Sequence, residues 1–209
     1  MAELMKGLTF RKATRNDIER IAEIIHGEPG AETVGMCGSV ERARAMGYAL
    51  VRIAGSAQGW DRSVVGELDG EVVVVLQAGS QLGGVKVTPS LALQAIRILG
   101  PFGAIGLLPK IRAQSRVNTK GPTDAYYVSE LHVHPHHRNR GFGGAALDYA
   151  EAEARQRGHS QMALIVTATN PARRLYERHG FRIVETRTDP AYERYTGIPG
   201  RHLMVKELA

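Results

Sequence analysis

The sequence contains only one cysteine, Cys37, so no disulfide can form within the chain. A single cysteine in 209 residues is typical of proteins from reducing compartments, and we expect a cytoplasmic protein. Residues 1–10 lack the long apolar core of a signal peptide, which supports the same expectation. Cys37 lies in a glycine-rich segment without a nearby histidine partner, so we do not expect it to act as a nucleophile.

Acidic residues are missing from a long stretch, since none occurs between Glu71 and Asp124. Six cations lie within it, as many as the net charge of +6: Lys86, Arg97, Lys110, Arg112, Arg116 and Lys120. A basic surface attracts phosphorylated cofactors, nucleic acid or acidic membranes. Aromatic residues make up only 6% of the chain, and only Phe102 falls among these cations. This is unlike a base-stacking platform, so we expect no nucleic-acid partner.

The sequence also lacks an uninterrupted apolar run long enough to cross a membrane. Its most apolar segment, residues 91–108, includes Gln94, Arg97 and the Gly100-Pro101 pair, so we expect no membrane span. The length predicts one domain, residues 1–209, in which residues 85–123 form a helical insertion.

Hydrophobic periodicity and turn signals predict alternating strands and helices. Thr14 to Asp17 read as a capping box before a helix that reaches about His26, and Asp69-Gly70 is a hairpin signal. The other expected strands are residues 8–13, 63–68, 71–77, 125–133, 162–167, 181–187 and 201–207. The other expected helices are residues 40–52, 88–100 with a further helical run interrupted by Pro109, 141–157, and one capped by Asn170; residues 27–39 and 188–200 read as loops. This order predicts an α/β or α+β domain with a mixed sheet.

Residues 130–146 are the most informative segment, because a short strand runs into a basic glycine-rich turn that opens a helix. The free N–H groups of a helix start and the positive end of its dipole favour an anion. Gly141, Gly143 and Gly144 carry no Cβ, so a pyrophosphate can approach the backbone closely, and Arg138 and Arg140 add charge. We therefore expect a phosphorylated cofactor at this turn.

Two motifs resemble those of the GNAT superfamily of N-acyltransferases. Glu130-Leu-x-Val-x-Pro followed by Arg138-x-x-Gly141-x-Gly143 resembles its acyl-CoA signature, and residues 170–181, with Asn170, Tyr176 and Phe181, resemble its second motif. Residues 10–21 are also similar to the family's opening. The resemblance covers most of the chain outside residues 85–123. It implies a mixed, mostly antiparallel sheet flanked by helices, with the insertion before the central strand.

The resemblance also implies a cofactor and a mechanism. The chain would transfer an acetyl group from acetyl-CoA, used as a co-substrate without a metal, directly to a small-molecule or peptide amine through a tetrahedral intermediate. Glu130 would act as general base, commonly through water, and Tyr176 would protonate the leaving thiolate. The amide near Val133 would stabilise the oxyanion. The cofactor-binding residues would be Leu131, His132, Val133, Arg138, Asn139, Arg140, Gly141, Phe142, Gly143, Gly144, Asn170 and Tyr176.

Other interpretations of these residues remain open. The glycine turn also fits a dinucleotide fingerprint, but the following strand ends at Thr167 without the carboxylate that would hold a ribose. His132, His134, His136 and His137 invite a metal hypothesis, yet no cysteine or carboxylate cluster joins them apart from Glu130. Glu130 can be a salt-bridge partner, Tyr176 a core aromatic and Asn170 a plain helix cap.

The role of the whole chain has a second interpretation, a non-catalytic module that senses CoA or binds polyanions. The basic insertion itself has three interpretations. It forms a lid or homodimer surface, it contacts an anionic membrane, or it contacts acidic phosphates. We expect the acceptor to enter between residues 27–39, the insertion and residues 188–200, where Glu28 and Glu32 could attract a cationic amine.

Overall fold

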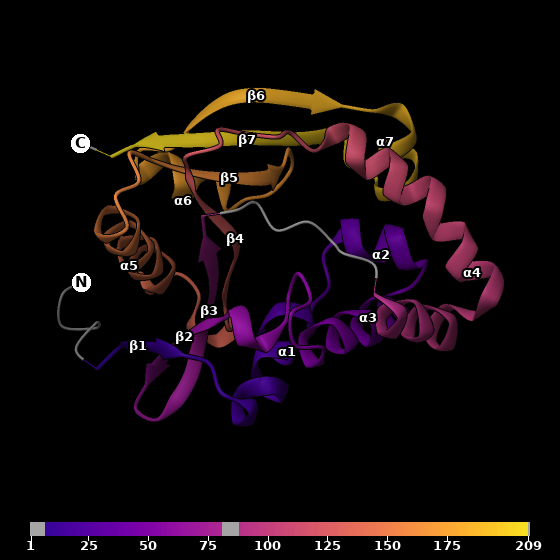
Figure 1. The fold of residues 1–209 in the computed structure, drawn as a ribbon, viewed down its shortest axis with the longest axis horizontal. Helices are drawn as coiled ribbons and strands as arrows, with labels where there is room; N and C mark the ends of the chain where they lie inside the picture. The colour runs from indigo at the N-terminus through magenta and orange to yellow at the C-terminus, as the bar shows by residue number, and fades with distance from the viewer. Residues whose placement is uncertain (1–6, 81–87, 209) are drawn as a thin grey trace.

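A seven-stranded sheet forms the centre of the computed structural model, which describes residues 7–80 and 88–208 (Figure 1). The strand order is β1-β2-β3-β4-β5-β7-β6. The strands are β1 Thr9–Lys12, β2 Val64–Leu68, β3 Glu71–Gly79, β4 Tyr126–Val133, β5 Gln161–Thr167, β6 Arg182–Thr188 and β7 Gly200–Glu207. All neighbouring pairs are antiparallel except β4 and β5, which run parallel. The predicted mixed, mostly antiparallel sheet is therefore confirmed.

Seven α-helices surround the sheet in the described part of the chain: α1 Ile18–His26, α2 Ala31–Cys37, α3 Val40–Arg52, α4 Pro89–Val117, α5 Phe142–Gln156, α6 Arg173–Arg178 and α7 Pro190–Thr196. The capping box before α1 forms as expected, because the Thr14 N–H donates to Oδ2 of Asp17 at 2.7 Å. Arg11 donates two further hydrogen bonds to the same carboxylate, of 2.8 and 2.9 Å.

Strand β3 is apolar on both faces because helices cover both. Val65 and Val75 pack with Ile21 and Ile25 of α1, while Val74 packs with Phe142 and Ala146 of α5. Its run from Val72 to Leu76 is buried throughout, which explains why it does not alternate with polar residues. This packing fixes the start of α5 against the central strands.

Two helices lie where the sequence predicts loops, so those expectations were wrong. Helix α2 falls within residues 27–39 and α7 within residues 188–200. Both are seven residues long and they pack on each other. Gly35 permits this contact, because a Cβ there would lie 2.1 Å from the Tyr195 carbonyl oxygen. The glycine that reads as a loop signal is needed for close helix packing.

The insertion forms one long helical element, α4, of 29 residues. Gly100 is non-helical, with φ +75°, so two helices meet there in a kink, in agreement with the prediction that the Gly-Pro pair closes the first helix; Pro109 does not interrupt the second. The second half packs against α7 and the first against α3. By length and composition alone, α4 is the one helix in the described residues that could cross a membrane, whereas the sequence predicts no span. Residues 85–87 of the predicted insertion lie outside the described residues.

Candidate active site

The two central strands separate at one end of the sheet. Parallel pairing joins Tyr126–Val128 of β4 to Met162–Leu164 of β5 and stops there. From Glu130 to Val133, β4 continues to pair with β3 only. Opposite Gln77 and Ala78 the register shifts, and Ser129 is the extra residue of a bulge. The backbone of Leu131, His132 and Val133 on the β5 side is therefore free for an extended ligand, as expected for the pantetheine arm.

The turn after β4 presents a row of backbone donors. Within the described residues, the N–H groups of residues 139–144 donate no hydrogen bond. Gly141 takes φ +88° and Asn139 φ +62°, conformations that turn the chain abruptly into α5. Because α5 has 15 residues, the positive end of its dipole adds to these donors. The predicted residues Asn139, Arg140, Gly141, Phe142, Gly143 and Gly144 together form a turn of backbone donors suited to an anion, which we call the anion cradle.

The glycines of this turn also bring α5 close to α6. A Cβ on Gly143 would lie 3.0 Å from Cδ2 of Leu175, and one on Gly144 would lie 3.1 Å from the His179 ring. Phe142 contributes its backbone only, since its ring is 1% exposed in the core. The start of α5 is therefore held against α6, which carries the second motif. Its backbone N–H groups face away from this contact.

The two arginines of the turn are already held in place. Nε of Arg138 donates to the Val133 carbonyl at 3.2 Å, and its guanidinium pairs with Glu28 at 3.1 Å. Arg140 donates to Nδ1 of His137 at 3.1 Å. Glu28 therefore lies against the proposed phosphate arginine. A bound pyrophosphate would compete with it for Arg138.

Glu130 lies at the opening in a polar cluster. Its Oε2 is 2.8 Å from Nε2 of His132, and its Oε1 accepts a hydrogen bond from Gln58 at 2.5 Å. Burial alone would raise the pKa of Glu130, but hydrogen bonds from His132 and Gln58 outweigh it and the pKa is lowered. The carboxylate is 22% exposed, ionised at neutral pH and within reach of solvent.

His26, which the sequence analysis did not single out, completes this cluster. It is 4% exposed at the end of α1, and burial lowers its pKa to about 4 against the nearby charge of Glu130. Gly47 of α3 gives it room, since a Cβ there would lie 2.2 Å from Cγ of His26. Its Nε2 is buried without a hydrogen-bond partner in the described residues. Gln58 and His26 are far from Glu130 in sequence, and no local pattern marks either.

Tyr176 of α6 is buried near the same opening, in a core cluster with Val128 and Leu164, where the β4–β5 pairing ends. Burial and the charge of Glu130 raise the pKa of its phenol to about 12, so the group stays protonated at neutral pH. Its ring packs edge-on against Phe181 at 6.1 Å. Asn170 caps the turn between β5 and α6 by accepting the Ala172 N–H at 2.8 Å, and α6 starts at Arg173, later than predicted. Glu130 and Tyr176 therefore both lie near the β4–β5 opening, close enough for the carboxylate charge to act on the phenol.

Glu32 is not available to attract a cationic acceptor. Its Oε1 accepts hydrogen bonds from Gln114 at 3.0 Å and Tyr192 at 2.8 Å, and it also pairs with Arg201. These contacts tie α2 to α4, α7 and β7, so Glu32 has a structural role.

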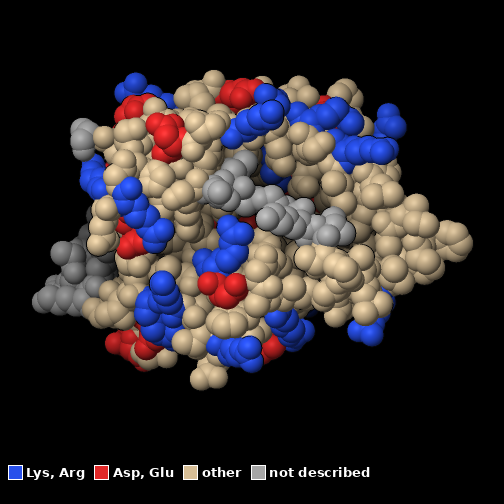
Figure 2. Space-filling view, viewed as in Figure 1, with Lys and Arg blue, Asp and Glu red and all other residues tan. Residues whose placement is uncertain are grey.

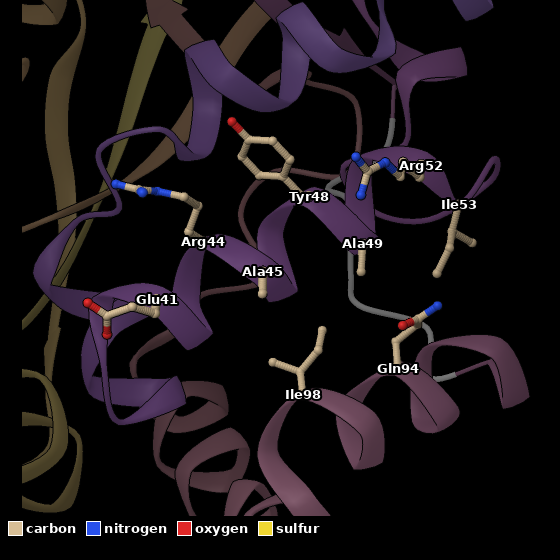
Figure 3. A pocket seen from close by; sticks show the side chains of 9 residues that line it. All are labelled: Glu41, Arg44, Ala45, Tyr48, Ala49, Arg52, Ile53, Gln94 and Ile98. Carbon is tan, nitrogen blue, oxygen red and sulfur yellow. The ribbon is translucent and has the colours of Figure 1, made fainter.

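Two other features of the described residues lie apart from the Glu130 cluster. No cluster of three or more His, Cys, Asp or Glu side chains is placed to hold a metal there, although His134, His136 and His137 lie with ring centroids 5.3 to 5.8 Å apart. A cleft of about 550 Å³ lies between α3 and α4 (Figure 3). Its lining, which includes Arg44, Tyr48 and Ile98, shares no residue with the Glu130 cluster.

Comparison with known proteins agrees with this geometry. Residues 101–181 match the model of the acetyltransferase (GNAT) family. A search of curated proteins finds no significant match. Among solved structures, histone acetyltransferase HPA2 and related acetyltransferase from Corynebacterium glutamicum is 22% identical, with 97% of each chain covered and a TM-score of 0.61.

Two further solved structures share the fold. Mosquito arylalkylamine N-acetyltransferase like 5b is 18% identical, covering 97% of this chain and 100% of that one, with a TM-score of 0.57. PaiA N-acetyltransferase from Thermoplasma acidophilum, in complex with coenzyme A, is 14% identical, covering 97% and 99%, with a TM-score of 0.55. The family match spans both motifs, and together with this shared fold it supports the resemblance to the GNAT superfamily of acetyltransferases.

Proposed function

We propose that the protein is an N-acetyltransferase that passes the acetyl group of acetyl-CoA directly to an amine. The observation that carries this proposal is the β4–β5 opening, which has an anion cradle at residues 139–144 and the Glu130 cluster beside it. A diphosphate held at the cradle leaves the exposed edge of β4 to pair with the pantetheine arm. The thioester would then lie near Glu130 and Tyr176.

The chain's own residues supply the proton transfers that this reaction needs. An amine attacks only after it has lost its proton, and the ionised Glu130 can accept one directly or through water. His132, hydrogen-bonded to the carboxylate, holds it in position for this step. Near the same opening, the Tyr176 phenol can donate to the departing sulfur. Holding amine and thioester together contributes further to the rate.

The backbone donors of the cradle suit a diphosphate better than they suit a carboxylate, because the cradle combines six N–H groups with a helix start. The glycines leave room for that approach, and Arg138 adds charge once it leaves Glu28. Acetyl-CoA therefore fits the residues present. Cytoplasmic localisation and a single domain over residues 1–209 stay predictions.

The first experiment is titration calorimetry of the purified chain with acetyl-CoA. The variant combines Arg138→Ala with Gly143→Asp, which removes a cation and adds an anion at the cradle. We expect it to weaken binding at least tenfold, since each charge-assisted hydrogen bond contributes about 1.5–3 kcal/mol. The matched control is Arg182→Ala on β6, another exposed arginine. Undiminished binding by the double variant would exclude the cradle as the diphosphate site.

The second experiment measures release of the CoA thiol with a panel of arylalkylamines, small amines and lysine peptides. The first and last classes are chosen from the names of the arylalkylamine and histone enzymes with the same fold. Turnover with any member supports the proposal. Tight acetyl-CoA binding without turnover of any amine would instead favour the CoA-sensing interpretation.

A further inference from the structure

Helix α4 carries large apolar side chains on the outside of the molecule. Phe102 is 88% exposed, Ile105 64% and Leu108 58%, and the values fall to 40–48% for the neighbouring residues Leu93, Ile96 and Ile111. The most exposed residues therefore follow the bend at Gly100. Figure 1 shows this bent part of α4 at the end of the molecule farthest from α5. Contiguous apolar exposure of this kind marks a contact surface.

Both halves of α4 are fixed to the domain. In the first half, Leu91 and Leu99 are buried among residues of α2 and α3. In the second, Ala113 and Val117 are fully buried with Tyr192 and Ile198. A transmembrane arrangement would have to pull all of these side chains out of their cores. Although α4 is long enough to cross a bilayer, the fold presents only its bend and outer face.

The charges beside this face are positive. No acidic residue occurs between Glu71 and Asp124, while Arg97 and Arg112 on α4 are exposed and form no ion pair within the described residues. Figure 2 shows the projecting end of the molecule without charged side chains and with Lys or Arg on either side of it. The outer face of α4 thus combines a protruding apolar ridge with flanking cations.

These features distinguish two occupants of the face. A second copy of this chain would bring its own Arg97 and Arg112 to the contact, and α4 offers no acid to neutralise them. A narrow convex ridge also buries little area against another rigid surface. An anionic bilayer matches both features, because its interface accepts apolar side chains and its headgroups attract cations.

We propose that the outer face of α4 inserts into the interfacial layer of an anionic lipid membrane, with Phe102, Ile105 and Leu108 in the acyl boundary. Arg97 and Arg112 then lie at headgroup level. This docking is independent of acetyl transfer, and the active site lies on other elements. The domain would remain folded as described, since only side chains that are already exposed enter the lipid.

Flotation of the full chain with vesicles tests this proposal. The vesicles are pure phosphatidylcholine or phosphatidylcholine with about one third phosphatidylserine, and we expect binding to the anionic vesicles only or far more strongly. The variant Phe102→Ser, Ile105→Ser, Leu108→Ser should lose at least tenfold in partition coefficient, because three apolar contacts are removed. Arg97→Gln and Arg112→Gln should each weaken binding about fivefold and reduce its salt dependence.

The matched control is Ile183→Ser with Val184→Ser on β6, since these residues are 39% and 58% exposed but lie outside α4. It should bind vesicles like the unmodified chain. A thermal melt of each variant, expected to be unchanged, excludes loss of folding. The proposal is overturned if the chain does not float with anionic vesicles, or if the triple variant binds them as well as the unmodified chain does.

A labelled cysteine gives an independent readout. Because Cys37 is buried, a polarity-sensitive dye can be attached selectively to Phe102→Cys or, as control, Val184→Cys. Emission from position 102 should shift to the blue with anionic vesicles, and emission from position 184 should not. Light scattering without lipid tests the alternative occupant, a second copy of this chain. A dimer that the triple serine variant dissociates, together with no dye shift, would make this face a contact between copies and refute membrane docking.

Discussion

Glu130 and His132 lie two residues apart on β4, and their side chains meet with Oε2 and Nε2 2.8 Å apart. Alternate residues of a strand share a face, so the central strand itself sets this pair. An ionised carboxylate only accepts hydrogen bonds, and therefore Nε2 of His132 carries the proton. Gln58 holds the other carboxylate oxygen, so the pair is oriented from two elements. The hydrogen bonds that lower the pKa of Glu130 also keep it charged, as the proposed proton transfer requires.

Replacing Glu130 with Gln should lower kcat about 10²-fold, because the amide cannot take a proton from the amine. The Michaelis constant for acetyl-CoA should change little, since the cradle is untouched. Steady-state kinetics with the best amine of the panel measure both values. Glu185→Gln on β6 is the control, an acid 39% exposed at its side chain and away from the opening. Full activity of Glu130→Gln would assign this carboxylate a purely structural role.

The Tyr176→Phe variant tests the proposed proton donor near the opening. Phenylalanine keeps the packing against Phe181, so stability should change by less than about 1 kcal/mol while kcat falls at least about tenfold. With the pKa of Tyr176 near 12, its ionisation should produce no loss of activity up to about pH 10. Tyr149→Phe, another tyrosine packed on an aromatic ring, is the control. Equal rates for Tyr176→Phe and the unmodified chain would contradict the donor role.

The parts of this protein that the sequence predicts are those fixed by neighbouring residues. The capping box at Thr14, the bounds of α3 and the glycine-rich turn before α5 each depend on local chemistry. The anion cradle is of this kind, because a strand, a glycine turn and a helix start are contiguous. For the same reason the expected order of β4, the turn and α5 is confirmed.

The missed features depend on contacts between distant segments. Glycines in and around α2 predict a loop there, yet Gly35 is the residue that allows α2 to contact α7. Gln58 and His26 reach Glu130 only because α1 and the segment after α3 fold over the central strands. Glu32 reads as a free acid in the sequence, and only the tertiary structure reveals its contact with Tyr192.

Gly141→Ala should weaken both stability and acetyl-CoA binding. Its φ of +88° is unfavourable for any residue with a Cβ, although no atom beyond its neighbours lies within 4 Å of one. The cost is therefore backbone strain of about 1–2 kcal/mol. Urea unfolding and calorimetry measure the two effects. Gly106→Ala on α4 is the control, because it also has open space but is not in the left-handed region, and helix propensity should leave it neutral or stabilised.

The buried His26 should make stability depend on pH between about 4 and 6.5. Burial lowers its pKa to about 4, while an unfolded chain has a histidine pKa near 6.5. Between these values the unfolded chain binds a proton that the folded protein excludes, so the free energy of unfolding falls as the pH drops. The contribution is fully present above about pH 6.5, and about 3 kcal/mol is lost by pH 4.

Comparison with His26→Gln isolates this contribution, because glutamine does not titrate. Urea unfolding at pH 7, 6, 5 and about 4 should give a shallower pH dependence for the variant than for the unmodified protein. The absolute stability of the variant is not the readout, since the exchange also alters packing against Gly47. His136→Gln replaces an exposed histidine and should keep the steep dependence, because the buried imidazole remains. The same slope in His26→Gln and the unmodified chain would mean that His26 is protonated in the folded protein, and its buried Nε2 would then need a partner such as Glu130 to hold the charge.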